Sequence, residues 1–150
     1  MTVKQDETSG LITRLQRLRA RRAVDRLDEL RTLARLASSS MSQSAIAVAL
    51  GVSQPAVSKR LREAAELAPV REGFSGASAY EIAQRCAAGE LSREQVLEEL
   101  SRWSYEPGDR GDGVDWLSVR LGEFERTVGK AADQGLIDGE LYDELVRRLA

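Results

Sequence analysis

The stretch QSAIAVALGVSQPAVSKRL, residues 43–61, has the spacing of two short helices joined by a tight turn. Ala47 is small, as a residue must be where two helices cross closely. Gly51, four residues later, can take the positive φ that ends a helix. Ser53 is a favourable N-cap, and Pro55 falls in the first helical turn, where its missing N–H costs little. The spacing therefore predicts a helix-turn-helix.

Apolar and polar side chains separate onto two faces of the second predicted helix. Val57 and Leu61 lie about one turn apart on it. They can pack back on Ile46, Ala47 and Leu50 of the first helix, which closes a small core. The opposite face then carries side chains that can hydrogen-bond to base edges or phosphates: Gln54 at the N-terminal end, followed by Pro55, Ser58, Lys59 and Arg62.

The segment SQPAVSKRL, residues 53–61, resembles the recognition helix of LysR-type regulators and of other bacterial helix-turn-helix repressors. Such a helix lies in the major groove of double-stranded DNA, while the preceding helix touches phosphates. The resemblance implies that Gln54, Ser58 and Lys59 contact bases, with Ser53 and Pro55 beside them. It implies phosphate contacts for a second set of residues: Ser42, Gln43, Ser44 and Arg62.

Composition narrows the fold and the chemistry. Aromatic residues make up only 5% of the 150 residues, so the core must be largely Leu, Val, Ile and Ala, which favours an all-α fold. The chain has no histidine and one cysteine, Cys86. This excludes an intramolecular disulfide, a histidine-based metal site and a Ser-His or Cys-His catalytic pair. We expect no enzyme activity, no metal and no cofactor, and we expect Cys86 to be a buried small apolar residue.

Charge divides the chain into two halves. Residues 1–72 hold 13 Lys/Arg against 8 Asp/Glu, whereas residues 73–150 hold 9 against 16, so the halves carry +5 and −7. The first half can approach DNA phosphates, and the second would be repelled by them. The acidic half is expected to face a basic protein partner, or simply to keep a small domain soluble.

The order of predicted segments is as follows. Residues 1–9 are polar and expected to be a disordered tail. Residues 10–68 form the helix-turn-helix domain with a long N-terminal helix, residues 69–78 a linker, and residues 79–150 an acidic helical domain for interaction or dimerisation. In the long helix, a leucine stripe (Leu11, Leu15 and Leu18) favours dimerisation. The arginine-rich segment 14–26 leaves a DNA-tracking arm as the alternative.

Further helices are predicted in the acidic domain. They lie near 78–88, from Ser92 with a Ser92–Gln95 capping box, near 117–134, and after an Asp138 cap to Leu149. The loop 105–115 lacks the ligand spacing of a calcium site despite Asp109, Asp112 and Asp115. Three carboxylates are expected to be solvated on the helix surface: Glu94, Glu98 and Glu99. Three aromatic residues are expected to lie in the core of the acidic domain: Trp103, Tyr105 and Trp116.

Together these features predict a DNA-binding transcription regulator, a repressor that resembles an autoregulating antitoxin in its layout. We expect a homodimer in the cytoplasm, with no membrane span and a possible protein partner, a toxin or another protein, bound through residues 79–150. The alternative is a helical adaptor or architectural protein in which the helix-turn-helix fold does not bind DNA.

Overall fold

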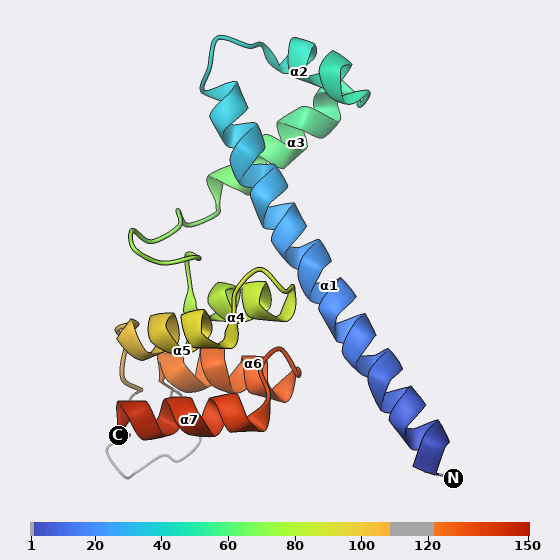
Figure 1. The fold of residues 1–150 in the computed structure, drawn as a ribbon. Coiled ribbons are helices and arrows are strands. Elements are labelled where there is room, and N and C mark those ends of the chain that lie inside the picture. Colours follow the sequence, from blue (N-terminus) through green and yellow to red (C-terminus); the bar gives the residue numbers. More distant parts are fainter. Residues whose placement is uncertain (1, 109–121) are drawn as a thin grey trace, which may run out of the picture. The chain divides into compact units, whose positions relative to one another are not determined.

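The computed structural model describes residues 2–108 and 122–150, and its fold is all-α, as predicted (Figure 1). No strand occurs in these two described ranges. In chain order the elements are α1 (Thr2–Ala37), α2 (Gln43–Leu50), α3 (Gln54–Ala65), α4 (Ala79–Ala87), α5 (Arg93–Arg102), the π-helical turn η2 (Glu125–Gly129), α6 (Lys130–Asp133) and α7 (Gly139–Leu149).

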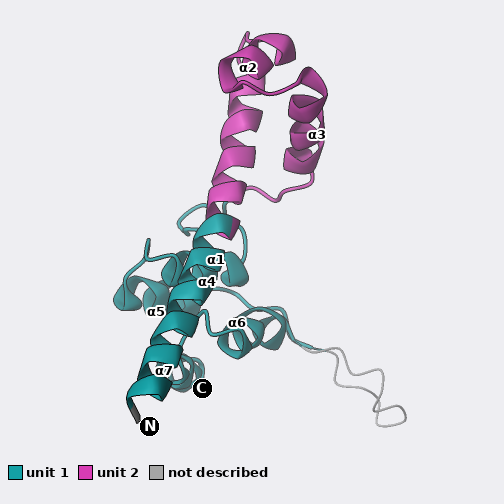
Figure 2. Cartoon of the chain, turned by 90° about the vertical axis from the view of Figure 1, so that its right-hand side faces the viewer, with its two compact units in different colours: residues 1–22, 70–150 teal, residues 23–69 magenta. Residues whose placement is uncertain are grey.

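The chain divides into two compact units (Figure 2). One unit, here called the helix-turn-helix unit, consists of residues 23–69. The other, called the acidic unit, consists of residues 1–22 together with residues 70–150. The sequence placed residues 10–22 with the helix-turn-helix, but their contacts lie with the acidic unit. The helix-turn-helix unit therefore begins inside α1, at residue 23, and ends after Pro69.

The expected disordered tail, residues 1–9, is instead helical from Thr2 onward. No proline interrupts the segment, and hydroxyls support the backbone. Thr8 donates to the Lys4 carbonyl at 2.7 Å, and Thr13 donates to the Ser9 carbonyl at 3.0 Å. These residues belong to one continuous helix of 36 residues. Its first turns extend the predicted long helix toward the N-terminus.

A small core holds the helix-turn-helix unit together. Ile46, Ala47 and Val57 are buried as predicted, and Leu61 packs on them. The prediction for Leu50 is wrong, because its side chain is 52% exposed. Three residues outside the motif complete this core: Leu33, Ala37 and Met41.

The acidic unit has the larger core, built from α4, α5, η2, α6 and α7. Trp103 is 4% exposed and lies in this core, as predicted. Tyr105 is partly buried, and its ring packs edge-to-face on Phe124 at 5.2 Å. Burial raises the pKa of the Tyr105 hydroxyl above its ordinary range. Cys86 is half-buried against the same core, and burial and the Asp138 carboxylate raise its pKa.

The predicted linker, residues 69–78, is packed rather than free. The Phe74 ring meets Trp103 edge-to-face at 4.8 Å, and the Arg71 guanidinium lies 4.0 Å from the centre of the Trp103 ring. The Gly73 carbonyl accepts a hydrogen bond from Arg102 at 2.9 Å. Through these contacts the 69–78 segment packs on the acidic unit and helps to bury the Trp103 side chain.

Glu99 on α5 departs from the prediction of a solvated carboxylate. Its side chain is buried, with 6% exposure, and accepts hydrogen bonds from the backbone N–H and the hydroxyl of Ser75. Glu94 is exposed as expected, and Glu98 is exposed but pairs with Arg102. Glu99 therefore fastens the 69–78 segment onto α5.

Local helix signals are confirmed in the acidic unit. Ser92 and Gln95 form the predicted capping box, and the Asp138 carboxylate accepts from the Leu141 N–H at 2.7 Å. The helix expected near 117–134 is present over Glu123 to Asp133 and includes the π-helical turn. Some predictions fall outside the described residues: those for Asp109, Asp112, Asp115 and Trp116, and the start of that helix.

Candidate nucleic-acid interface

Short-range hydrogen bonds set the geometry of the turn between α2 and α3. The Ser42 hydroxyl accepts from the Ala45 N–H at 3.1 Å and caps α2. Gly51 ends α2 in the left-handed region, with φ 69°, which an L side chain rarely adopts. The Ser53 hydroxyl then accepts from the Ala56 N–H at 3.2 Å and caps α3. The turn at Gly51 and the cap at Ser53 agree with the sequence prediction.

The predicted DNA-contacting residues lie within the helix-turn-helix unit, at the starts of α2 and α3 and along one face of α3. Ser58 is half-buried, and the others are exposed: Ser42, Gln43, Ser44, Ser53, Gln54, Pro55, Lys59 and Arg62. An exposed row of donors and acceptors of this kind is available to a ligand. We call these residues the polar face.

A hydrogen bond that the sequence analysis did not predict joins the two helix starts. The Nε2 of Gln54 donates to the Oε1 of Gln43 at 2.9 Å. Gln54 keeps one N–H and its carbonyl oxygen unused by this bond. That donor and acceptor match the N7 and N6 groups on the major-groove edge of adenine. The sequence signal was a glutamine at the first position of each helix.

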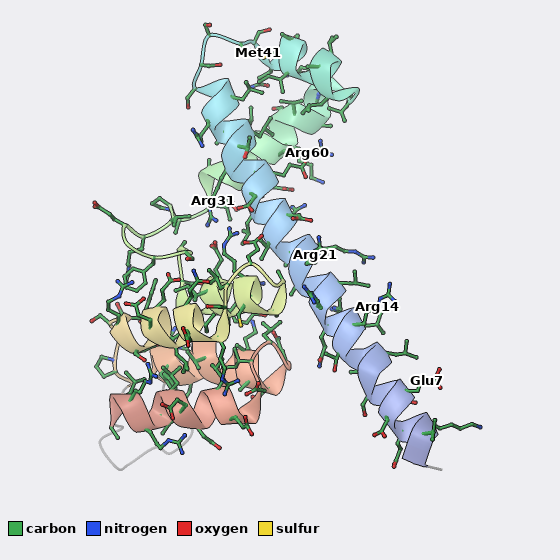
Figure 3. The ribbon with its side chains drawn as sticks, in the orientation of Figure 1. Glu7, Arg14, Arg21, Arg31, Met41 and Arg60 are labelled. Atoms are coloured by element: carbon green, nitrogen blue, oxygen red, sulfur yellow. The ribbon has the colours of Figure 1, made fainter. Side chains whose placement is uncertain are left out.

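The basic side chains of α3 divide between two directions. Arg62 donates to the Ser58 hydroxyl at 3.4 Å, so its guanidinium lies on the polar face. Arg60, labelled in Figure 3, lies instead 4.0 Å from the Glu29 carboxylate on α1. Lys59 makes no ion pair with any described residue. Lys59 and Arg62 thus offer charge on the polar face, and Arg60 does not.

No acidic residue lies among the residues of the polar face. Residues 30–62 contain no Asp or Glu and five Lys or Arg. The carboxylates of this unit lie before and after that range, and two of them are paired: Glu63 with Arg26, and Glu29 with Arg60. The polar face itself therefore holds two positive charges, Lys59 and Arg62, and no negative one, although the unit as a whole is nearly neutral.

The acidic unit holds a second candidate surface. An open groove of about 490 Å³ is lined by Glu125, Gly129, Ala132, Asp133, Gly139 and Tyr142. Glu125 and Asp133 are exposed and make no ion pair within the described ranges. By contrast, the neighbouring Glu144 is paired with Arg147 and Arg148, whose guanidinium groups lower its pKa. The unpaired carboxylates mark this groove as a place for positive charge.

No protein-family model, curated protein or solved structure matches this chain. Among residues 2–108 and 122–150, no group of three or more acidic, cysteine or histidine side chains could hold a metal ion. No helix in those ranges combines the length and apolar composition that crossing a membrane requires.

Proposed function

We propose that this chain is a sequence-specific DNA-binding transcription regulator, a repressor that acts without enzymatic chemistry. The observation that carries the proposal is the Gln54–Gln43 hydrogen bond at the start of α3. It fixes an amide with a free donor and acceptor at the start of α3, whose polar-face residues include two cations and no carboxylate. Major-groove readers use this combination of an N-terminal amide and a basic polar face.

The proposed docking places α3 in the major groove. Gln54, Ser58 and Lys59 reach base edges, with Pro55 against the groove wall. The N-terminus of α2 meets a phosphate, because its free N–H groups and the helix dipole attract anions. The residues assigned to phosphates are Ser42, Gln43 and Ser44 on that terminus and Arg62 on α3, and Ser53 lies beside the base-contacting residues.

The remaining partners follow from charge and symmetry. Regulators of this kind bind near-palindromic sites as two-fold dimers, so we propose a homodimer in the cytoplasm. The acidic unit would repel DNA and is proposed to bind a basic protein, in the manner of an antitoxin that neutralises a toxin and represses its own operon.

One observation favours a second candidate function, a protein adaptor. Val48 is 84% exposed and Leu50 is 52% exposed, so α2 presents apolar surface outward. An apolar side chain as open as that of Val48 offers a contact to a protein partner. An adaptor would use Val48 and Leu50 and would leave Lys59 and Arg62 without a role.

Selection from a pool of random duplex DNA by the full chain separates the two functions. A regulator is expected to enrich one motif, with binding that weakens steeply as salt rises. Val48→Ser is expected to leave that enrichment unchanged. Failure to enrich any motif at low salt, with a folded protein, would refute the regulator and favour the adaptor.

A further inference from the structure

The leucine stripe of α1 is left uncovered in the acidic unit. Leu11 is 56% exposed, Leu15 is 59% exposed and Leu18 is 41% exposed. The neighbouring Ile12 is 51% exposed. A row of large apolar side chains along one helix face is the kind of surface that another molecule covers.

The stripe lies on the side of α1 that faces away from its own contacts. Gln16 donates to the Gln134 carbonyl at 3.5 Å, and the Arg17 guanidinium lies against Gly89. With 3.6 residues per turn, the leucine stripe points opposite to these two side chains. The acidic unit of the same copy therefore cannot cover it without releasing those contacts.

Arginines flank the stripe on both sides. Arg14 and Arg21 lie along one edge, and Figure 3 shows them directed away from α4–α7; Arg19 lies along the other edge. All three are exposed and make no ion pair among the described residues. Over residues 2–22 the helix holds six Lys or Arg against two acidic residues. Two such segments packed on each other would bring like charges together, which opposes α1–α1 pairing.

A second, partly exposed stripe with the same spacing lies on α7. Tyr142, Val146 and Leu149, here called the α7 stripe, follow the i, i+4, i+7 pattern of Leu11, Leu15 and Leu18. Val146 is 42% exposed and Leu149 is 40% exposed. Tyr142 also lines the groove whose small residues, Gly129, Ala132 and Gly139, leave room for a side chain from outside.

The border of the α7 stripe is acidic. Glu125 and Asp133 rim the groove beside Tyr142, and Asp143 is exposed on α7 next to it. None of these three carboxylates makes an ion pair within the described parts of the chain. Unpaired carboxylates around one stripe and unpaired guanidinium groups around the other are electrostatically complementary.

We propose that a second copy of this chain covers the leucine stripe, with the stripe of one copy packed on the α7 stripe of the other. A two-fold arrangement makes this contact twice, since each copy supplies both surfaces. The inference goes beyond DNA binding, because it uses only residues of the acidic unit. It holds or fails whether or not the polar face binds DNA.

Disulfide trapping between two differently tagged chains tests the pairing. Both chains carry Cys86→Ala, which removes the native thiol; one adds Leu15→Cys and the other Val146→Cys. After mixing in a glutathione redox buffer, the Leu15→Cys to Val146→Cys disulfide is expected to exceed either self-disulfide severalfold. Thr13→Cys, on the opposite side of α1, replaces Leu15→Cys as the matched control and is expected to give little product.

Two results would overturn the proposal. A Leu15→Cys chain that links mainly to itself would show α1–α1 pairing, and an absence of any product above the Thr13→Cys control would show that the stripe is not covered by this chain. Sedimentation equilibrium of the unmodified protein adds an independent readout. Association between unlike charges is expected to weaken at least about fivefold between low and high salt, and association that strengthens would contradict the charge assignment.

Discussion

Gln54 at the start of α3 donates a hydrogen bond to Gln43 at the start of α2, over 2.9 Å. The bond couples a side chain assigned to a base with one assigned to a phosphate. It also limits the rotamers of Gln54 before any DNA is present. Preorganisation of this kind lowers the entropy cost of binding DNA. Because the two glutamines are assigned to different groups of the DNA, substituting each of them is expected to change DNA binding differently.

We predict that Gln54→Ala relaxes selectivity at one base pair of the bound site. Loss of a bidentate contact costs about 1–3 kcal/mol of discrimination against the wrong base. Gln43→Ala is expected to weaken binding to matched and mismatched duplexes by a similar factor, because its role is positional. Binding titrations on a panel of single-base variants would check this. Equal losses of selectivity in the two variants would contradict the separate assignments.

We predict that Gly51→Ala destabilises the helix-turn-helix unit by about 1–2 kcal/mol, because the left-handed backbone there disfavours a Cβ. Open space surrounds Gly51, so the cost is conformational and not steric. Gly10→Ala, inside α1 with equal free space, is the matched control and is expected to stabilise by about 0.5–1 kcal/mol. Urea denaturation measures both. An unchanged free energy of unfolding in Gly51→Ala would contradict the requirement for a left-handed glycine in this turn.

We predict that Glu99→Ala destabilises the acidic unit by about 1–3 kcal/mol, because it leaves the Ser75 N–H and hydroxyl without their acceptor. Glu94→Ala on the same helix removes an exposed carboxylate and is expected to stay within about 0.5 kcal/mol. Thermal unfolding of the two variants compares them directly. Equal melting temperatures would mean that the 69–78 segment is not fastened by Glu99.

Asp138 predicts a pH dependence of stability. The Leu141 N–H and then the Arg93 guanidinium lower the pKa of its carboxyl below the ordinary value. Since the folded pKa is the lower one, the stabilisation is complete above the unfolded pKa of about 4 and disappears as pH falls through the folded pKa.

Asp138→Asn keeps a capping side chain but does not titrate. The difference in unfolding free energy between wild type and Asp138→Asn is therefore expected to be constant above about pH 5 and to shrink below about pH 4. Denaturant titrations across this range measure it. A difference that grows as pH falls would reverse the sign and contradict the assignment.

The parts of the fold that could be predicted from the sequence are those fixed by neighbours in the chain. Gly51 and the caps at Ser42, Ser53 and Asp138 depend on residues within four positions, so the pattern contains their geometry. The all-α class followed from the scarcity of aromatics and from apolar periodicity. Within the polar face, the division of α3 into two sides predicted the exposure of Lys59 and Arg62.

The features that could not be predicted depend on contacts between distant residues. Glu99 reads as a surface carboxylate on α5 until Ser75, 24 positions earlier, is placed beside it. The sequence predicts Leu50 as core, but the core is completed by Leu33 and Met41 from outside the motif, and Leu50 is exposed. Arg60 and Arg62 are two similar side chains on α3 that point in different directions. Arg60 lies near the Glu29 carboxylate on α1 and away from the polar face, and the sequence of α3 alone does not reveal this contact.

Binding of two α3 variants to the selected duplex decides whether the polar face contacts DNA. Lys59→Ala with Arg62→Ala removes two charges from the polar face and is expected to abolish specific binding and, through the phosphate contact of Arg62, to lower the salt slope of the remaining non-specific binding by about 1. Arg60→Ala removes one charge from the same helix on its α1 side, and its affinity is expected to stay within about threefold of wild type. Circular dichroism confirms that both variants fold. If the double variant binds as tightly as Arg60→Ala, the polar face is not the DNA-binding surface and the account is wrong.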